Sequence, residues 1–265
     1  MTAERLSTDD GCTLAYDVSG PATAPGLVLL HALGLDRTLW DDVAPALTRT
    51  HRVVRLDFRG HGQSGTPDAP WTIDRLGRDV LTVMDHLGIE RADVAGVSLG
   101  GLVTLWLGIH APARVRSLVP ANTAARIGTA ESWGDRIRTV MSQGLEPMAV
   151  AAPPRWFTPS FIEGSPARVA ACTEVLRATS VAGYLHTCAL LRDTDLRADV
   201  SAIRAATAVV GGTADVATPP SGAEWLAATI PGASLHLLTA GHLSNVERPA
   251  EFLAAMQTAL NAEVR

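Results

Sequence analysis

Short apolar runs alternate with longer segments in which apolar residues recur every three or four positions. The helical spacing along 72–89 predicts an amphipathic helix. The runs at 26–32 and 92–97 are apolar almost throughout, which is typical of strands covered on both faces of a parallel sheet. The pattern predicts strands at 13–18, 26–32, 51–58, 92–97, 115–121, 207–212 and 234–240, and helices at 72–89, 98–111, 221–230 and 248–260. This order predicts an α/β fold with a mostly parallel, doubly wound sheet.

The alternation stops between residues 123 and 196. Patterns in this stretch are helical, with no convincing strand, and seven arginines balance seven acidic residues. One predicted helix face contains Trp133, Ile137, Val140, Met141 and Leu145. The simplest interpretation is one α/β domain, residues 1–122 and 197–265, interrupted by a helical insertion at 123–196.

Composition narrows the possible chemistry. The net charge of −5 favours neither nucleic acid nor an anionic membrane as a partner. All 22 basic residues are arginines, which excludes Schiff-base and P-loop chemistry because both need a lysine. The sequence has no H-E-x-x-H or C-x-x-C motif and no G-x-G-x-x-G after a predicted strand. We therefore expect no metal and no dinucleotide cofactor.

The cysteines and the N-terminal residues indicate the cellular compartment in which the protein is expected. Cys12, Cys172 and Cys188 are odd in number and widely spaced, which favours a reducing cytoplasm over a disulfide framework. The N-terminal stretch lacks the basic and apolar regions of a signal peptide, and no uncharged apolar run is long enough to span a membrane. We expect a cytoplasmic protein.

Residues 96–100, Gly-Val-Ser-Leu-Gly, match the G-x-S-x-G pattern of a nucleophile elbow between a strand and a helix. The turn needs glycines because neighbouring chain passes close to it on both sides. The helix that follows directs free N–H groups toward an oxygen on which charge develops. We interpret Ser98 as a nucleophile; the alternative is a glycine-rich turn without chemistry.

A serine needs a base to remove its proton, and in this kind of fold the order along the chain is serine, acid, histidine. Among the eight histidines, His242 follows the last predicted strand on a loop. Asp215 follows the predicted strand 207–212 directly, whereas Asp193 and Asp195 come before it. We predict His242 as the base and Asp215 as the acid that orients it. The alternative for each is an ordinary loop residue.

The oxyanion of an acyl-transfer reaction needs two N–H donors. We predict the backbone N–H groups of Leu99, which follows the serine, and of Leu33, in the loop after the strand at 26–32. His31 precedes the serine, so we assign it to bracing that loop.

Together these residues resemble the α/β-hydrolase superfamily. A closer resemblance, over most of the chain, is to the 3-oxoadipate enol-lactone hydrolases, and it rests on "LDFRGHGQS", "NTAARIG", "PRWFTPSF" and "GHLSNVERP". The resemblance implies a catalytic triad of Ser98, Asp215 and His242, and a helical cap at 123–196 over the site. It implies opening of 3-oxoadipate enol-lactone in bacterial aromatic breakdown, without a cofactor.

The implied lactone carries a free carboxylate, which needs a partner in an apolar pocket. Arg126 and Arg155 lie in the stretches that resemble the lactonases, and an arginine binds both oxygens of a carboxylate. Alternatively, these arginines pair with Glu131 or Glu146 on the surface. Trp133 and Trp156 are expected to wall the pocket or to fill the cap core.

Two alternatives to enol-lactone hydrolysis stay open. One is a carboxylesterase or lactonase for another small substrate, because the fold alone does not determine the substrate. The other is a hydrolase-like signal receptor that keeps the triad and turns over slowly.

Overall fold

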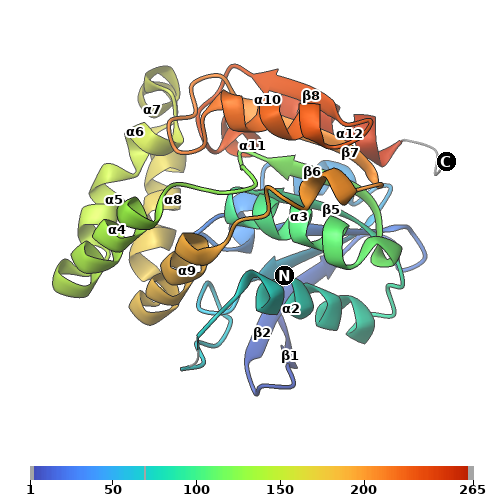
Figure 1. The fold of residues 1–265 in the computed structure, drawn as a ribbon, viewed down its shortest axis with the longest axis horizontal. Helices are drawn as coiled ribbons and strands as arrows, with labels where there is room; N and C mark the ends of the chain where they lie inside the picture. Colours follow the sequence, from blue (N-terminus) through green and yellow to red (C-terminus); the bar gives the residue numbers. More distant parts are fainter. Residues whose placement is uncertain (1–2, 69, 262–265) are drawn as a thin grey trace.

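The computed structural model describes residues 3–68 and 70–261. Its centre is a sheet of eight strands in the order β1-β2-β4-β3-β5-β6-β7-β8 (Figure 1). β1 pairs antiparallel with β2 and β2 pairs antiparallel with β4, whereas all other neighbours are parallel. The strands are β1 (Glu4–Ser7), β2 (Thr13–Ser19), β3 (Gly26–Leu30), β4 (Arg52–Asp57), β5 (Ala92–Val97), β6 (Val115–Ala121), β7 (Ala206–Gly212) and β8 (Ser234–Leu238).

The predicted mostly parallel α/β fold is confirmed. Each predicted strand is present within two residues at either end. β1 was missed because it has only four residues, none of them fully buried. The short helices η1 (Arg37–Trp40) and α1 (Ala44–Leu47) were missed as well, because neither is long enough to show a helical period.

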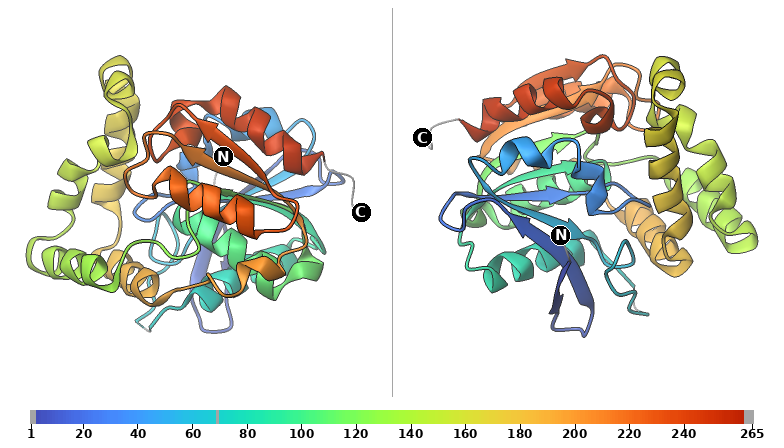
Figure 2. Two further views of the ribbon diagram at one scale, coloured as in Figure 1. Left: turned by 45° about the horizontal axis from the view of Figure 1, so that its top comes forward. Right: turned by 180° about the vertical axis from the view of Figure 1, so that it is seen from behind.

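Helices cover both faces of the sheet (Figure 2). Side chains of the central strands alternate between two buried clusters: Val94 of β5 packs with one and Ala95 with the other. The helices on the first face are α2 (Ile73–His86), α3 (Leu99–His110) and α10 (Pro220–Thr229); those on the second include α1 and α12 (Pro249–Leu260). The remaining short helices of this part are η2 (Pro112–Arg114), η3 (Val200–Ala202) and α11 (Ser244–Glu247).

Residues 123–196, called the cap segment below, lie between β6 and β7 and lie to one side of the sheet in Figures 1 and 2. Its helices are α4 (Ala130–Gln143), α5 (Glu146–Ala151), α6 (Pro153–Trp156), α7 (Pro159–Gly164), α8 (Pro166–Ala178) and α9 (Val181–Asp193). α4 begins at a capping box in which the Thr129 side chain accepts a hydrogen bond from the Ser132 N–H.

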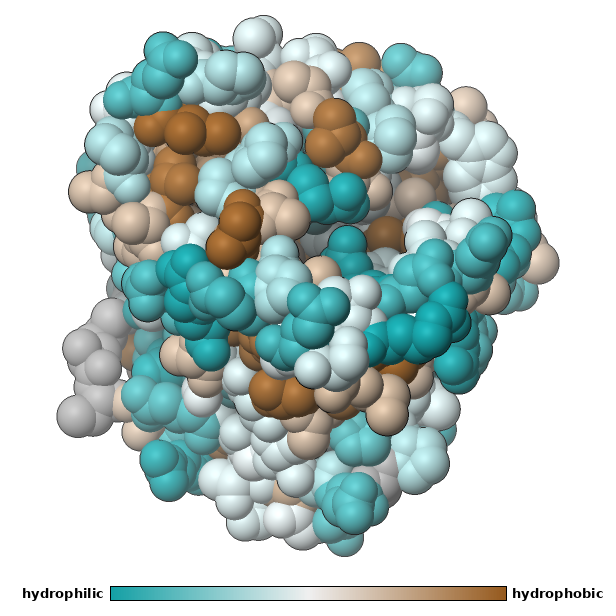
Figure 3. All heavy atoms as spheres, turned by 90° about the vertical axis from the view of Figure 1, so that its left-hand side faces the viewer, coloured by the Kyte–Doolittle hydropathy of each residue, from teal (hydrophilic) through white to brown (hydrophobic). Residues whose placement is uncertain are grey.

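The predicted face of α4 was wrong at its C-terminal end. The helix ends at Gln143, because Gly144 adopts a φ of 71° at the C-cap, so Leu145 lies beyond it. Met141 is 72% exposed. Figure 3 shows the cap side of the molecule, where apolar patches are interrupted by hydrophilic side chains. Within the described residues, no helix has both the length and the apolar character needed to cross a bilayer.

Candidate active site

Ser98 lies at the sharp turn between β5 and α3. Its φ of 57° and ψ of −112° are unusual for a residue other than glycine. A methyl group on Gly96 would lie 2.2 Å from the backbone of Gly100, and one on Gly100 would lie 2.3 Å from the carbonyl oxygen of Leu30. Both glycines are therefore required for close backbone packing. The elbow holds one strained residue, at a typical cost of about 1–3 kcal/mol, which is a signature of functional sites.

The elbow opens into a cavity of about 220 Å³. The α/β core lines it with Leu33, Ser98 and His242, and the cap segment with Trp133, Arg155 and Tyr184. Ser98 is only 8% exposed. Any ligand that reaches its hydroxyl is thus enclosed by both parts of the chain.

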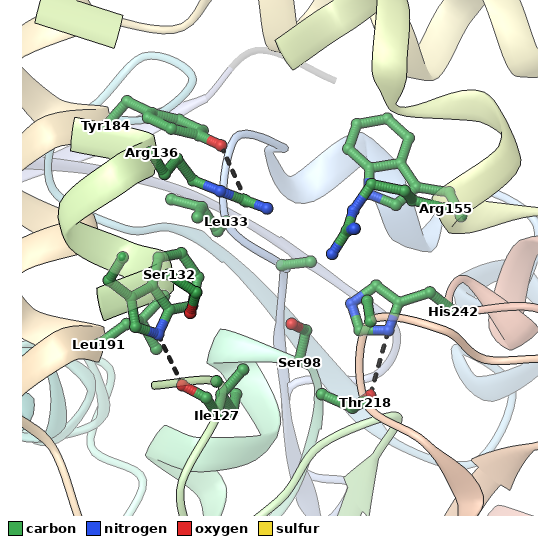
Figure 4. A pocket seen from close by; sticks show the side chains of 15 residues that line it. Leu33, Ser98, Ile127, Ser132, Arg136, Arg155, Tyr184, Leu191, Thr218 and His242 are labelled. Atoms are coloured by element: carbon green, nitrogen blue, oxygen red, sulfur yellow. Dashed lines mark hydrogen bonds between the residues drawn. The ribbon is translucent and has the colours of Figure 1, made fainter. Parts of the chain in front are cut away.

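His242 and Asp215 come from the loops after β8 and β7. The Nδ1 atom of His242 lies 2.8 Å from the Oδ2 atom of Asp215, and both side chains are buried. With Nδ1 as the donor, the Nε2 atom is left to accept a proton. Ser98 and His242 line the same cavity and are drawn there together in Figure 4. Within the described residues the hydroxyl makes no hydrogen bond to protein, and such contacts often shorten only when substrate binds.

The carboxylate of Asp215 is held by several donors. Its Oδ1 atom accepts from the backbone N–H groups of Ala217 and Thr218, each at 2.8 Å. Its Oδ2 atom accepts from the Thr218 hydroxyl at 2.8 Å and from the Asn122 amide at 3.1 Å. Burial alone raises the pKa of this carboxyl, but the charge of His242 and these hydrogen bonds hold the pKa below its usual value. Asp215 is therefore ionised at neutral pH.

Sequence reasoning missed Asn122. It directly follows β6 with a φ of 44°, and its amide also donates to the Gly241 carbonyl at 3.2 Å. Its carbonyl oxygen accepts from the Ser244 hydroxyl at 2.5 Å. It thus ties the Asp215 loop to the His242 loop. The sequence could have indicated Asn122 by its position: it follows the carboxyl end of a predicted strand, and ligands bind at that edge of such sheets.

The two predicted oxyanion donors lie on either side of the Ser98 site in the chain: one in the loop after β3 and one directly after the serine. Leu33 lines the cavity, and Leu99 is the first residue of α3, next to Ser98. Among the turn, loop and cap bonds of residues 3–68 and 70–261, neither N–H donates to a protein acceptor. His31 is buried; its Nδ1 atom lies 2.8 Å from the Ala32 carbonyl, and its Nε2 atom accepts from the Phe58 N–H.

The predicted substrate-binding residues divide into two groups. Arg155, Trp133 and Trp156 line the cavity, and the Trp133 indole N–H donates to the Ile127 carbonyl at 2.6 Å. Arg126 does not line it and instead lies 3.5 Å from Asp195.

Glu146, considered as a surface partner for Arg126 or Arg155, and Asp193 and Asp195, considered as the acid beside His242, do not line the cavity. Glu146 pairs with Arg177 of α8, and Asp193 and Asp195 pair with neighbouring arginines on the surface. Within the described residues Arg155 has no acidic partner, and burial together with the charge of Arg136 lowers its pKa.

Arg136 is a second cavity residue that sequence reasoning missed. It lies one helical turn after Trp133 in α4, and its guanidinium carbon lies 4.9 Å from the centre of the Trp133 ring. It donates to the Tyr184 hydroxyl at 3.3 Å. Within the described residues neither Arg136 nor Arg155 has a carboxylate at ion-pair distance, so two arginine charges line the cavity without a directly paired acid.

Comparison with known proteins places the chain in a family. The family model described as the alpha/beta hydrolase fold matches residues 25–158. The chain belongs to the α/β-hydrolase family. The predicted resemblance to one branch of this family is also confirmed, by relatives that match nearly the whole chain.

Among these α/β hydrolases, 3-oxoadipate enol-lactonase 2 of Acinetobacter baylyi is 38% identical, over 96% of this chain and 95% of its own. 3-Oxoadipate enol-lactonase 1 of the same species is 35% identical, over 94% and 93%. The solved enol-lactonase from Burkholderia xenovorans LB400 is 36% identical with a TM-score of 0.95, over 98% of this chain and 100% of its own. The chain is thus an enzyme, a hydrolase similar to 3-oxoadipate enol-lactonases.

Proposed function

We propose that this hydrolase opens the ring of 3-oxoadipate enol-lactone to give 3-oxoadipate, through an acyl-enzyme on Ser98. The main support is one arrangement: a strained, enclosed serine shares a cavity with a histidine whose other ring nitrogen lies 2.8 Å from a buried carboxylate. The names of the two Acinetobacter relatives support the choice of substrate.

In the proposed mechanism the Ser98 hydroxyl attacks the lactone carbonyl while the Nε2 atom of His242 takes its proton. The N–H groups of Leu33 and Leu99 hold the oxyanion that forms. Collapse breaks the ring C–O bond, and His242 returns the proton to the enol oxygen, which tautomerises to the ketone. Water, activated by His242, then attacks the acyl-enzyme and releases the new carboxylate and Ser98. Asp215 keeps the imidazole in the required tautomer and stabilises its charged form.

The same cavity offers a partner for the substrate's free carboxylate. Arg155 lines the cavity and Arg126 does not, so we assign this role to Arg155, assisted by Arg136. Both guanidinium groups lack an acidic partner within the described residues, and a bound carboxylate removes their mutual repulsion. Trp133 and Trp156 form apolar walls. The chemistry requires neither metal nor cofactor, and we place it in cytoplasmic breakdown of aromatic compounds.

The test follows the ultraviolet absorbance of the enol-lactone, alongside a panel of simple lactones and esters, with Ser98→Ala as control. We expect sustained turnover with a kcat/KM for the enol-lactone far above that for the panel. A preference for another ester or lactone contradicts the proposed substrate. Stalling after about one equivalent indicates a slow receptor, since enzymes typically run at about 1 to 1,000 per second.

A further inference from the structure

The predicted oxyanion donor Leu33 lies in a tight turn. The Leu35 N–H donates to the Ala32 carbonyl at 3.1 Å, and Gly34 has a φ of 75° at the third position, as a type II turn requires. The Leu33 N–H is the peptide group between the first two residues of this turn. Its direction therefore changes whenever the turn shifts.

The cap segment packs directly on this turn. A methyl group on Gly34 would lie 2.5 Å from Leu176 Cδ1 and 3.1 Å from Tyr184 Cε2, so these side chains touch the backbone. The Thr179 hydroxyl donates to the Gly34 carbonyl at 3.1 Å. Helices α8 and α9 thus determine where the turn lies.

Tyr184 has a second contact through its hydroxyl, on the ring carbon next to Cε2. Its hydroxyl accepts a hydrogen bond from Arg136, drawn in Figure 4, while its ring is 2% exposed. Arg136 lines the reaction cavity and stacks on Trp133. One buried side chain therefore links a charge that faces the substrate to the backbone of the oxyanion turn.

Tyr184 also has space beside it. Together with Arg136 and Leu176 it lines a second, partly open pocket of about 240 Å³ formed by residues of the cap segment. A side chain packed solidly on all sides would hold one position. The second pocket allows small movements of the ring and of Arg136.

We propose that Tyr184 is a positioning residue that couples recognition of the substrate's carboxylate at Arg136 to the position of the Leu33 N–H. A carboxylate that binds Arg136 holds the guanidinium in place, which holds the Tyr184 hydroxyl and, through its ring, the turn at Gly34. Charged substrates then meet a better-formed oxyanion hole. This inference rests on the proposed serine mechanism, but it does not depend on the enol-lactone being the natural substrate.

The test compares two esters with the same leaving group: the p-nitrophenyl monoester of glutaric acid and its neutral methyl p-nitrophenyl diester. With simple charge recognition the free carboxylate lowers KM alone, because ground state and transition state gain equally. With coupling it also raises kcat. For the wild type we expect a kcat advantage of about tenfold for the charged ester, the scale of one hydrogen bond to a charged group.

The decisive variant is Tyr184→Phe, which removes the hydroxyl and keeps the ring on Gly34. We expect the kcat advantage to disappear, while KM for the charged ester stays the lower of the two because both arginines remain. Tyr16→Phe is the matched control: Tyr16 is also buried and its hydroxyl donates to Glu4, but it does not line the cavity. It should keep the advantage.

Arg136→Met should remove the same advantage, and adding Tyr184→Phe to it should cause no further loss, as for two parts of one network. The coupling is overturned if the wild type shows no kcat advantage. It is also overturned if Tyr184→Phe keeps the advantage, or slows both esters equally, as a purely structural residue would. If the wild type hydrolyses neither these esters nor the enol-lactone, the proposed function itself has failed.

Discussion

The loops of the α/β core and the helices of the cap segment present opposite kinds of charge to one cavity. In the core, the carboxylate of Asp215 is fully satisfied by Asn122, Thr218, Ala217 and His242. In the cap segment, Arg136 and Arg155 face the cavity with no acidic partner among the described residues. The hydrogen bonds to Asp215 are complete within the protein, whereas under the proposed function Arg136 and Arg155 obtain their counter-charge from the bound substrate. The proposed function therefore assigns reaction chemistry to the core loops and substrate choice to the cap segment.

The sharpest test of the core side is Ser98→Ala. We expect a loss of about 10⁶-fold in kcat, the scale for losing the nucleophile of such a site. Circular dichroism and thermal unfolding should show a folded protein. A folded variant with activity within about tenfold of wild type would place the nucleophile elsewhere.

Asp215→Asn tests whether the pair with His242 works as proposed. We expect kcat to fall by about 10⁴-fold, because the amide favours the wrong imidazole tautomer. Asp193→Asn and Asp195→Asn are matched controls, since both carboxylates pair with surface arginines. A larger loss in either control than in Asp215→Asn would mean that the acid is misassigned.

Arg155→Met tests the cap side. We expect kcat/KM for a carboxylate-bearing substrate to fall by about 10- to 150-fold, which corresponds to a loss of about 1.5–3 kcal/mol. A neutral ester of the same size should react almost as before. Arg126→Met is the control, because Arg126 lies beside Asp195 outside the cavity. If both substrates slow together, Arg155 supports the structure of the cap instead of binding the carboxylate.

The last expected effect concerns stability at acidic pH instead of activity, and it belongs to the core. Burial lowers the pKa of His31 to about 4 and that of His61 to about 3 from an ordinary value near 6.5. The unfolded chain binds these protons first, so stability is present above about pH 6.5 and is lost as the pH falls toward the folded pKa values. At pH 5 each histidine should cost about 2 kcal/mol of unfolding free energy.

Urea unfolding at pH 7.5 and pH 5 measures this loss. His61→Leu should reduce the difference in unfolding free energy between the two pH values, because it removes one of the two buried imidazoles whose pKa burial lowers. Among the described residues its Nε2 atom has no hydrogen-bond partner, so the substitution breaks no hydrogen bond there. His110→Leu is the control, since that histidine is exposed. An unchanged difference in His61→Leu would show that other groups cause the acid sensitivity.

The strands and the order of the candidate catalytic residues could be predicted, because both depend on local residue patterns or on order along the chain. Apolar runs predict strands covered on both faces, and the chain order of Ser98, Asp215 and His242 follows from the order of the strands. Asn122 was missed although it follows β6 directly at the strand edge where the site lies. Arg136 was missed because the choice of arginines relied on motif resemblance, although its spacing from Trp133 predicts contact on one helix face.

The sequence by itself determined the fold class, the elbow at Ser98 and the candidates for base and acid, because strand periodicity and the glycine requirements of a sharp turn are local properties. Only the tertiary structure decided which arginines face the cavity. The cap helices α8 and α9 have little amphipathic character, so the period of their apolar residues does not specify how they pack on one another. That packing turned Arg136 and Arg155 inward and left Arg126 with Asp195. It also brought Tyr184 against Gly34, a residue 150 positions earlier in the chain.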